Sequence, residues 1–185
     1  MNLRLMILCR FVPLSIKTAR IKELFKLTAA AFDVALPDLS GLKYRELLEG
    51  YACFAKTESD KIIKDMKKTA EVRNRLYKSA VATGLRVKDE LKIKNYDDVL
   101  VASRIFYRIL GIEFSGDTDG NITISKCFFS RYFSAENCGL ISALDEGVAQ
   151  GLSGGSLKFT QRITEKKDCC KAKMIFKQEA GRTGL

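Results

Sequence analysis

The chain contains 185 residues, of which 46% are hydrophobic and 29% are charged, the composition of an ordinary globular protein. We therefore expect a single domain that spans residues 1–185. The formal net charge of +10 favours anionic partners over cationic ones. The sequence has no histidine, which removes the usual general base near neutral pH and the commonest metal ligand. Catalysis would have to use cysteine, an acidic residue, lysine, tyrosine or a bound metal.

The cysteines and the first residues of the chain predict a compartment. The six cysteines are irregularly spaced, and the short apolar run of residues 5–9 is followed by Arg10 without a small-residue cleavage site. This pattern indicates reduced thiols in a cytoplasmic protein rather than a disulfide framework. No uncharged apolar run approaches the roughly 18 residues needed to span a bilayer, so we expect no membrane partner.

The first half of the chain, residues 1–94, is predicted to be helical. Three segments place apolar residues at spacings of three and four: 15–34, 38–55 and 59–85. Pro37 ends the first helix, and Asp38 or Ser40 is predicted to cap the second. The charged residues 86–94 are predicted to form a connector. The basic residues of this half have no interleaved aromatic side chains, so nucleic acid is not an expected partner.

Residues 95–177 change from a helical pattern to an alternating one. Asn95 is a strong helix start, and the helix that it begins is expected to end at Gly111. Residues 112–115 and 121–126 are predicted to form two strands, because they are joined by a Gly-Asp-Thr-Asp-Gly turn.

A further helix, predicted from Ser134 to Leu152, carries a thiol and a carboxylate on its apolar face. At about 100° per residue, Cys138 and Asp145 point in nearly the same direction. Burying an unpaired carboxylate is costly, so Asp145 is expected to have a partner.

Two alternating segments, residues 157–164 and 170–176, are predicted to form a hairpin. Cys170 then faces the core, and if the alternation holds, Arg162 points to the opposite face of the sheet and cannot share a site with it. The predicted fold class is α+β, with a helical N-terminal half packed on a C-terminal antiparallel sheet of about four strands that is crossed by a helix. Residues 178–185 lack a pattern and are expected to be a frayed tail.

Two interpretations of the cysteine-rich region need no reaction at a thiol. In the first, Cys127, Cys138 and Cys170 fill the core as small apolar side chains, and Asp145 caps a neighbouring backbone group. In the second, the same four residues hold zinc or iron, because thiolates and a carboxylate are suitable ligands for either metal.

The third interpretation is catalytic. One of these thiols is a nucleophile, Asp145 or Glu146 moves a proton, and Arg162 or Lys158 holds an anionic substrate. Since the chain has no histidine, the thiolate would have to be stabilised by basic side chains or by a helix terminus.

The order of these residues is similar to that of two related families, over residues 95–177. The shared features are Cys127, an aromatic stretch, Cys138, Asp145, Gly147, the turn from Gly151 to Gly155, the strand from Leu157 to Thr164, and Cys170. In this order the chain resembles the L-2-amino-thiazoline-4-carboxylic acid hydrolase family and the broader 4-vinyl reductase domain. It departs from the family pattern at Lys166-Lys167-Asp168, where a glycine usually precedes the last cysteine.

The resemblance implies two alternative functions. The hydrolase family implies hydrolytic opening of a small cyclic amidine or related carboxylate, with Cys138, Cys127 and Asp145 as catalytic groups and with Arg162 and Lys158 at the substrate. The 4-vinyl reductase domain implies a non-catalytic small-molecule or metal-binding sensory domain, with a pocket between helices and an antiparallel sheet. The favoured prediction is the hydrolase, acting on an anionic small molecule, with a homodimer as one expected assembly.

Overall fold

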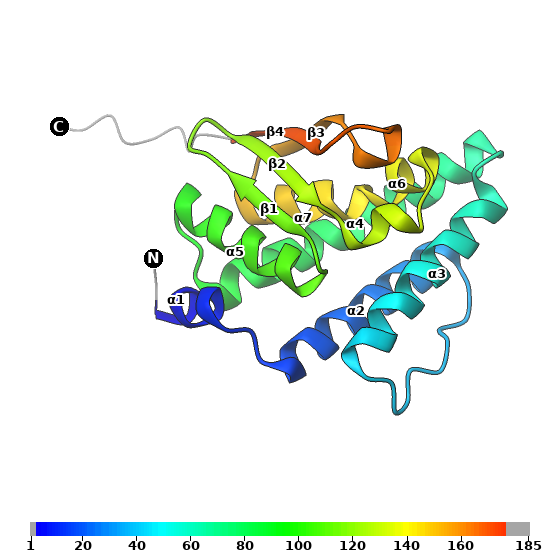
Figure 1. The fold of residues 1–185 in the computed structure, drawn as a ribbon, viewed down its shortest axis with the longest axis horizontal. Coiled ribbons are helices and arrows are strands. Elements are labelled where there is room, and N and C mark those ends of the chain that lie inside the picture. The colour runs from blue at the N-terminus through cyan, green and yellow to red at the C-terminus, as the bar shows by residue number, and fades with distance from the viewer. Residues whose placement is uncertain (1–2, 177–185) are drawn as a thin grey trace.

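The computed structural model describes residues 3–176 and has the predicted α+β architecture (Figure 1). Its helices are α1 (Leu3–Arg10), α2 (Leu14–Phe32), α3 (Tyr44–Ile62), α4 (Met66–Leu91), α5 (Tyr96–Ile109), α6 (Ala135–Ile141) and α7 (Ala143–Ser153). Its strands are β1 (Glu113–Gly116), β2 (Asn121–Lys126), β3 (Ser156–Gln161) and β4 (Cys170–Ile175). The predicted tail, residues 178–185, lies outside the described residues.

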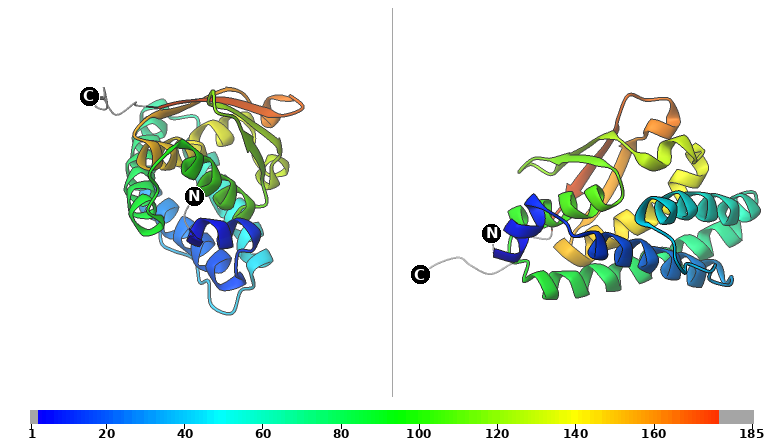
Figure 2. Two further views of the ribbon diagram at one scale, coloured as in Figure 1. Left: turned by 90° about the vertical axis from the view of Figure 1, so that its left-hand side faces the viewer. Right: turned by 60° about the horizontal axis from the view of Figure 1, so that its bottom comes forward.

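The sheet is antiparallel, with the strand order β1-β2-β4-β3. In β4, buried residues alternate with exposed ones, because one face of the sheet is covered by helices and the other meets solvent. Helices α5 and α7 lie directly against the covered face, and α2 and α3 lie farther from the sheet (Figure 2). The main core fills the space between these layers.

The hairpin of β3 and β4 is less regular than a simple alternation predicts. Phe159 lies opposite Ala172, but Gln161 lies opposite Lys171, so one extra residue is inserted in β3 between these pairs. The strand ends at Gln161, and a short 3-10 turn follows at Ile163–Glu165. The side chains beyond the inserted residue therefore change faces.

Helix α7 packs on α4 through glycines. A Cβ atom added to Gly147 would lie 2.7 Å from the Ala80 Cβ, and one added to Gly151 would lie 2.7 Å from the Gly84 Cα. The two helix backbones can approach this closely because these positions carry no side chain. Asp145 is two residues before Gly147, or about 200° around the helix. Because the glycine face of α7 packs on α4, the Asp145 carboxylate points away from α4.

Several helix boundaries differ from the predicted ones. The segment predicted as one helix over residues 59–85 contains the end of α3 and the start of α4, with Asp65 capping α4 by accepting a hydrogen bond from the Lys68 amide. The predicted connector 86–94 is mostly helical, because α4 continues to Leu91. The helix predicted over residues 134–152 is divided at Ser142. Its hydroxyl donates to the Gly139 carbonyl, a local side-chain bond of the kind that interrupts helices.

Other local predictions agree with the structure or fail for a simple reason. Asn95 caps α5 and accepts a hydrogen bond from the Asp98 amide, as predicted. Gly111 has a φ of +67°, as expected at the end of that helix. Neither Asp38 nor Ser40 caps α3, because the helix begins at Tyr44 and its N-cap residue is Lys43. The Asp38 carboxylate instead accepts bonds from the amide and hydroxyl of Ser40 in a local turn.

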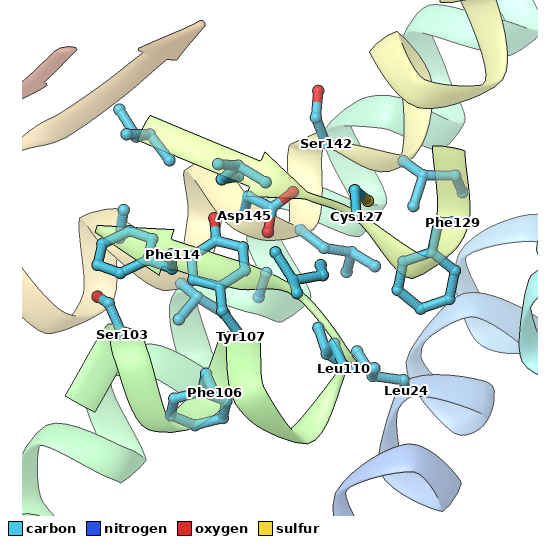
Figure 3. A pocket seen from close by; sticks show the side chains of 18 of the residues that line it. Leu24, Ser103, Phe106, Tyr107, Leu110, Phe114, Cys127, Phe129, Ser142 and Asp145 are labelled. Atoms are coloured by element: carbon cyan, nitrogen blue, oxygen red, sulfur yellow. The ribbon is translucent and has the colours of Figure 1, made fainter. Parts of the chain in front are cut away.

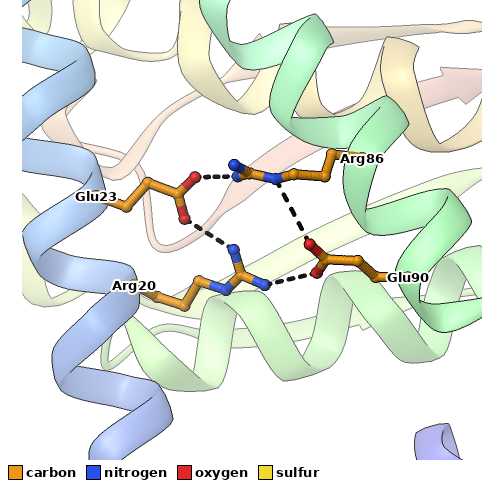
Figure 4. A network of polar contacts seen from close by, with 4 residues as sticks. All are labelled: Arg20, Glu23, Arg86 and Glu90. Atoms are coloured by element: carbon orange, nitrogen blue, oxygen red, sulfur yellow. Dashed lines mark hydrogen bonds and ion pairs between the residues drawn. The ribbon is translucent and has the colours of Figure 1, made fainter.

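A network of four charged side chains joins α2 to α4 (Figure 4). Arg20 lies 2.8 Å from Glu23 and 3.2 Å from Glu90, and Arg86 pairs with both of these carboxylates. Each arginine therefore bridges two acids. Within the described chain, no helix combines the length and the apolar character needed to cross a membrane.

Candidate functional site

A cavity of about 150 Å³ lies between the covered face of the sheet and helices α5 and α7. Most of its lining is apolar and includes Phe114, Ile124, Phe129, Leu157 and Met174. The polar and thiol residues that line it are Tyr51, Thr83, Ser103, Tyr107, Cys127, Cys138, Ser142, Asp145, Arg162 and Cys170, with Arg20 and Glu23 contributed by α2. Figure 3 shows Asp145, Ser142 and Cys127 on one side of the cavity, and Leu24, Leu110 and Phe106 on another.

Asp145 reaches this cavity from α7 and meets Tyr107 from α5 (Figure 3). Burial raises the pKa of Asp145 to about 6, the nearby Glu146 also raises it, and the hydrogen bond from the Tyr107 hydroxyl and the charge of Arg162 oppose the rise. The part of the Asp145 side chain that remains accessible lines the cavity. A carboxyl group with this pKa can give or take a proton near neutral pH.

The Tyr107 ring is fixed by its neighbours. It is 8% exposed and stacks on Phe114, with the ring centroids 4.8 Å apart. Burial, reinforced by the charge of Asp145, raises the pKa of Tyr107 well above its ordinary value, so the hydroxyl keeps its proton. The hydroxyl therefore faces Asp145 in its neutral form.

Arg162 enters the same cavity from the end of β3. Its Nη2 donates to the Ser142 hydroxyl at 3.2 Å, and its Nη1 lies 3.7 Å from Glu165. The guanidinium lies over the Phe159 ring, 4.8 Å from the centroid. Its buried Nε has no hydrogen-bond partner in the structure, so the arginine has an unused donor at a site where unused donors are costly.

The three predicted thiols line this cavity from separate elements. Cys127 follows β2, Cys138 lies in α6, and Cys170 begins β4. Burial raises the pKa of Cys127 to about 12 and also raises the pKa values of Cys138 and Cys170. The thiolate form is therefore disfavoured in all three.

The predicted metal site is not formed. Among residues 3–176, no group of three or more Cys, Asp or Glu side chains is arranged to hold a metal ion. Cys127, Cys138, Cys170 and Asp145 line one cavity, but they come from different elements of the fold. The interpretation of these four residues as a zinc or iron site therefore has no support among the described residues.

The structure places two basic residues differently with respect to the cavity. The sequence left open whether Arg162 and Cys170 share a site, and the extra residue in β3 returns Arg162 to the covered face, where both residues line the cavity. Lys158 lies opposite Lys173 and is exposed on the solvent face of the sheet. Lys158 therefore cannot bind a molecule held beside Asp145.

Two polar groups of the cavity were missed from the sequence. Tyr107 falls within the apolar pattern of its helix, where an aromatic residue is normally a core residue. The available signal was Ser103, four residues earlier and also buried, since this spacing places two polar side chains on one helix face. Ser142 gave no signal, because its role depends on the division between α6 and α7 and on Arg162.

Comparisons with known proteins add no assignment. The chain matches no protein-family model, and no curated protein is detectably similar to it in sequence. The functional argument therefore rests on the cavity.

Proposed function

We propose that this protein is a small-molecule-binding domain whose ligand occupies the cavity between the sheet and helices α5 and α7. The observation that carries the proposal is the composition of that cavity, which is mainly apolar with a few polar groups that face the same space. Small-molecule sites in proteins typically have this composition, in which the apolar lining supplies affinity and the polar groups fix orientation.

The volume limits the size of the ligand. A cavity of about 150 Å³ is comparable to an engineered apolar cavity, in another protein, that binds benzene. We therefore expect a compact molecule of this size as the occupant of the cavity in its present form.

Benzene is a suitable probe for this proposal. We expect it to perturb the NMR signals of cavity side chains such as Ile124 and Met174. Ala149 is 5% exposed and lines the cavity, so Ala149→Leu should fill part of the space and abolish the perturbation. Ala82→Leu, at an exposed position of α4, should leave binding intact. Failure of benzene to perturb the cavity of the folded wild-type protein would contradict the proposal.

A second candidate function is hydrolysis of a small cyclic amidine, for which the raised pKa of Asp145 is the favourable observation. In this proposal Asp145 moves the proton, because the raised pKa values of Cys127, Cys138 and Cys170 make these thiols poor nucleophiles. The test is turnover of 2-amino-thiazoline-4-carboxylate. Loss of turnover in Asp145→Asn, with turnover retained in Asp168→Asn at an exposed position, would support it, and the absence of turnover by wild-type protein would exclude this substrate.

A further inference from the structure

Two side chains of opposite charge face the cavity from different elements without pairing with each other. Asp145 comes from α7 and lies beside the Tyr107 hydroxyl (Figure 3). Arg162 follows β3 and pairs with Glu165. Among the described residues, the ion pairs within 4.0 Å do not include one between Asp145 and Arg162. The cavity therefore has an acidic group and a basic group with space available to both.

Each group has a contact that holds its position and capacity for a further partner. A carboxylate has two acceptor oxygens, and the neighbouring Tyr107 hydroxyl can satisfy at most one of those of Asp145. The Arg162 guanidinium is held by Ser142 and by the Phe159 ring, yet its buried Nε donates to nothing. The Thr164 hydroxyl, close by in sequence, is also buried without a hydrogen-bond partner.

We propose that the ligand is a small amphoteric molecule, whose cationic nitrogen binds Asp145 and whose carboxylate binds Arg162. This inference rests on the proposed binding function and names the class of ligand. Arg162 has a distant ion pair with Glu165 at 3.7 Å, and burying a charge without a close opposite partner is costly. A ligand with a single charge satisfies one of the two side chains, whereas an amphoteric ligand satisfies both.

The hydrocarbon part of such a ligand would lie against the apolar lining. Phe114, Ile124 and Phe159 line the same cavity as the two charged groups, and Phe159 also carries the Arg162 guanidinium on its face. With a cavity of about 150 Å³, an amino acid of about four carbons is close to the size limit set by benzene.

A matched set of compounds tests the inference by calorimetry on the full chain at pH 7.5. The amphoteric probes are 2-aminobutyrate and 4-aminobutyrate, isomers in which the charges are adjacent or far apart. Butyrate lacks the amine, propylamine lacks the carboxylate, and benzene carries no charge. We expect one aminobutyrate to bind at least tenfold more tightly than butyrate and propylamine. Equal or tighter binding of either singly charged compound, relative to both isomers, would overturn the inference.

Benzene separates this inference from the function on which it rests. Benzene binding without a preference for an aminobutyrate overturns the amphoteric ligand and leaves the binding function in place. No binding of any probe, benzene included, contradicts the binding function itself.

Two variants assign the charges. Asp145→Asn should remove the preference for the aminobutyrate over butyrate, and Arg162→Gln should remove its preference over propylamine. Lys158→Gln, on the solvent face of the sheet, is the matched control and should retain both preferences. Retained benzene binding shows that the cavity of each variant is intact, and an unchanged preference in both cavity variants would overturn the assignment.

Discussion

The Tyr107 hydroxyl of α5 and the Asp145 carboxyl group of α7 face each other in the cavity (Figure 3). This contact lies between the two helices that pack against the sheet, and it gives a polar neighbour to a carboxylate on an apolar helix face. Tyr107 lowers the pKa of Asp145 but does not offset the effect of burial, since that pKa is still raised from 3.8 to about 6.

The raised pKa of Asp145 predicts a pH dependence of stability. Between pH 4 and 6 the folded protein holds a proton on Asp145 more tightly than the unfolded chain does, so this group's contribution to stability is lost as the pH rises through that window. Above it, the buried charge destabilises the fold by at most about 3 kcal/mol, because the Asp145 residue is only partly buried. Asp145→Asn should therefore be more stable than wild type at pH 7, as measured by urea unfolding.

The comparison has a direct control. Asp145→Asn should also flatten the decrease in stability between pH 4 and 6, whereas Asp168→Asn, at an exposed position, should retain it. Tyr107, Glu146 and Arg162 are the groups that act on Asp145. Unchanged pH dependence in Asp145→Asn would show that Asp145 titrates in its ordinary range.

The glycine contact between α4 and α7 predicts a sharp difference between two alanine substitutions. Gly147→Ala places a methyl group 2.7 Å from the Ala80 Cβ, so we expect a loss of about 1–3 kcal/mol from the free energy of unfolding. Gly139→Ala meets no atom within 4 Å and should gain up to about 1 kcal/mol from helix propensity. Thermal and urea unfolding measure both. Equal effects at the two positions would mean that α4 and α7 pack less closely at Gly147 than the structure shows.

The cysteines should differ in their rate of reaction with a thiol reagent at pH 8. Cys53 is exposed, whereas burial raises the pKa values of Cys127, Cys138 and Cys170. We expect a fast phase that disappears in Cys53→Ser, and we expect these three thiols to react only after the protein is denatured. A fast phase that survives Cys53→Ser and is lost on replacing one of the three would contradict this order.

The charged network between α2 and α4 should make a small, salt-dependent contribution. Glu23 pairs with Arg20 and Arg86, and its side chain is 24% exposed. Glu23→Gln should lower the free energy of unfolding by about 1 kcal/mol at low salt, and by less at about 1 M salt. Glu49→Gln, which removes an exposed pair with Arg45 within α3, should have little effect. A salt-independent loss in Glu23→Gln would point to packing instead of charge.

The parts of the fold that were predicted correctly depend on short-range interactions. The cap at Asn95 needs only the amide three residues later, and the turn between β1 and β2 needs only the residues from Gly116 to Gly120. The inward direction of Cys170 follows from alternation within one strand. The helical N-terminal half and the antiparallel sheet were predictable because each segment carries its own apolar spacing, helical or alternating, along the chain.

The arrangement of the cavity depends on residues far apart in the sequence, and here the tertiary structure decided the outcome. The sequence named Asp145, Arg162 and the cavity thiols but not the direction of Arg162, because an extra residue in β3 is defined only by the partner strand. It also gave no reason to pair Asp145 with Tyr107, which is 38 positions earlier in the chain. Local patterns set which face of an element is apolar, whereas packing between elements sets which polar groups meet.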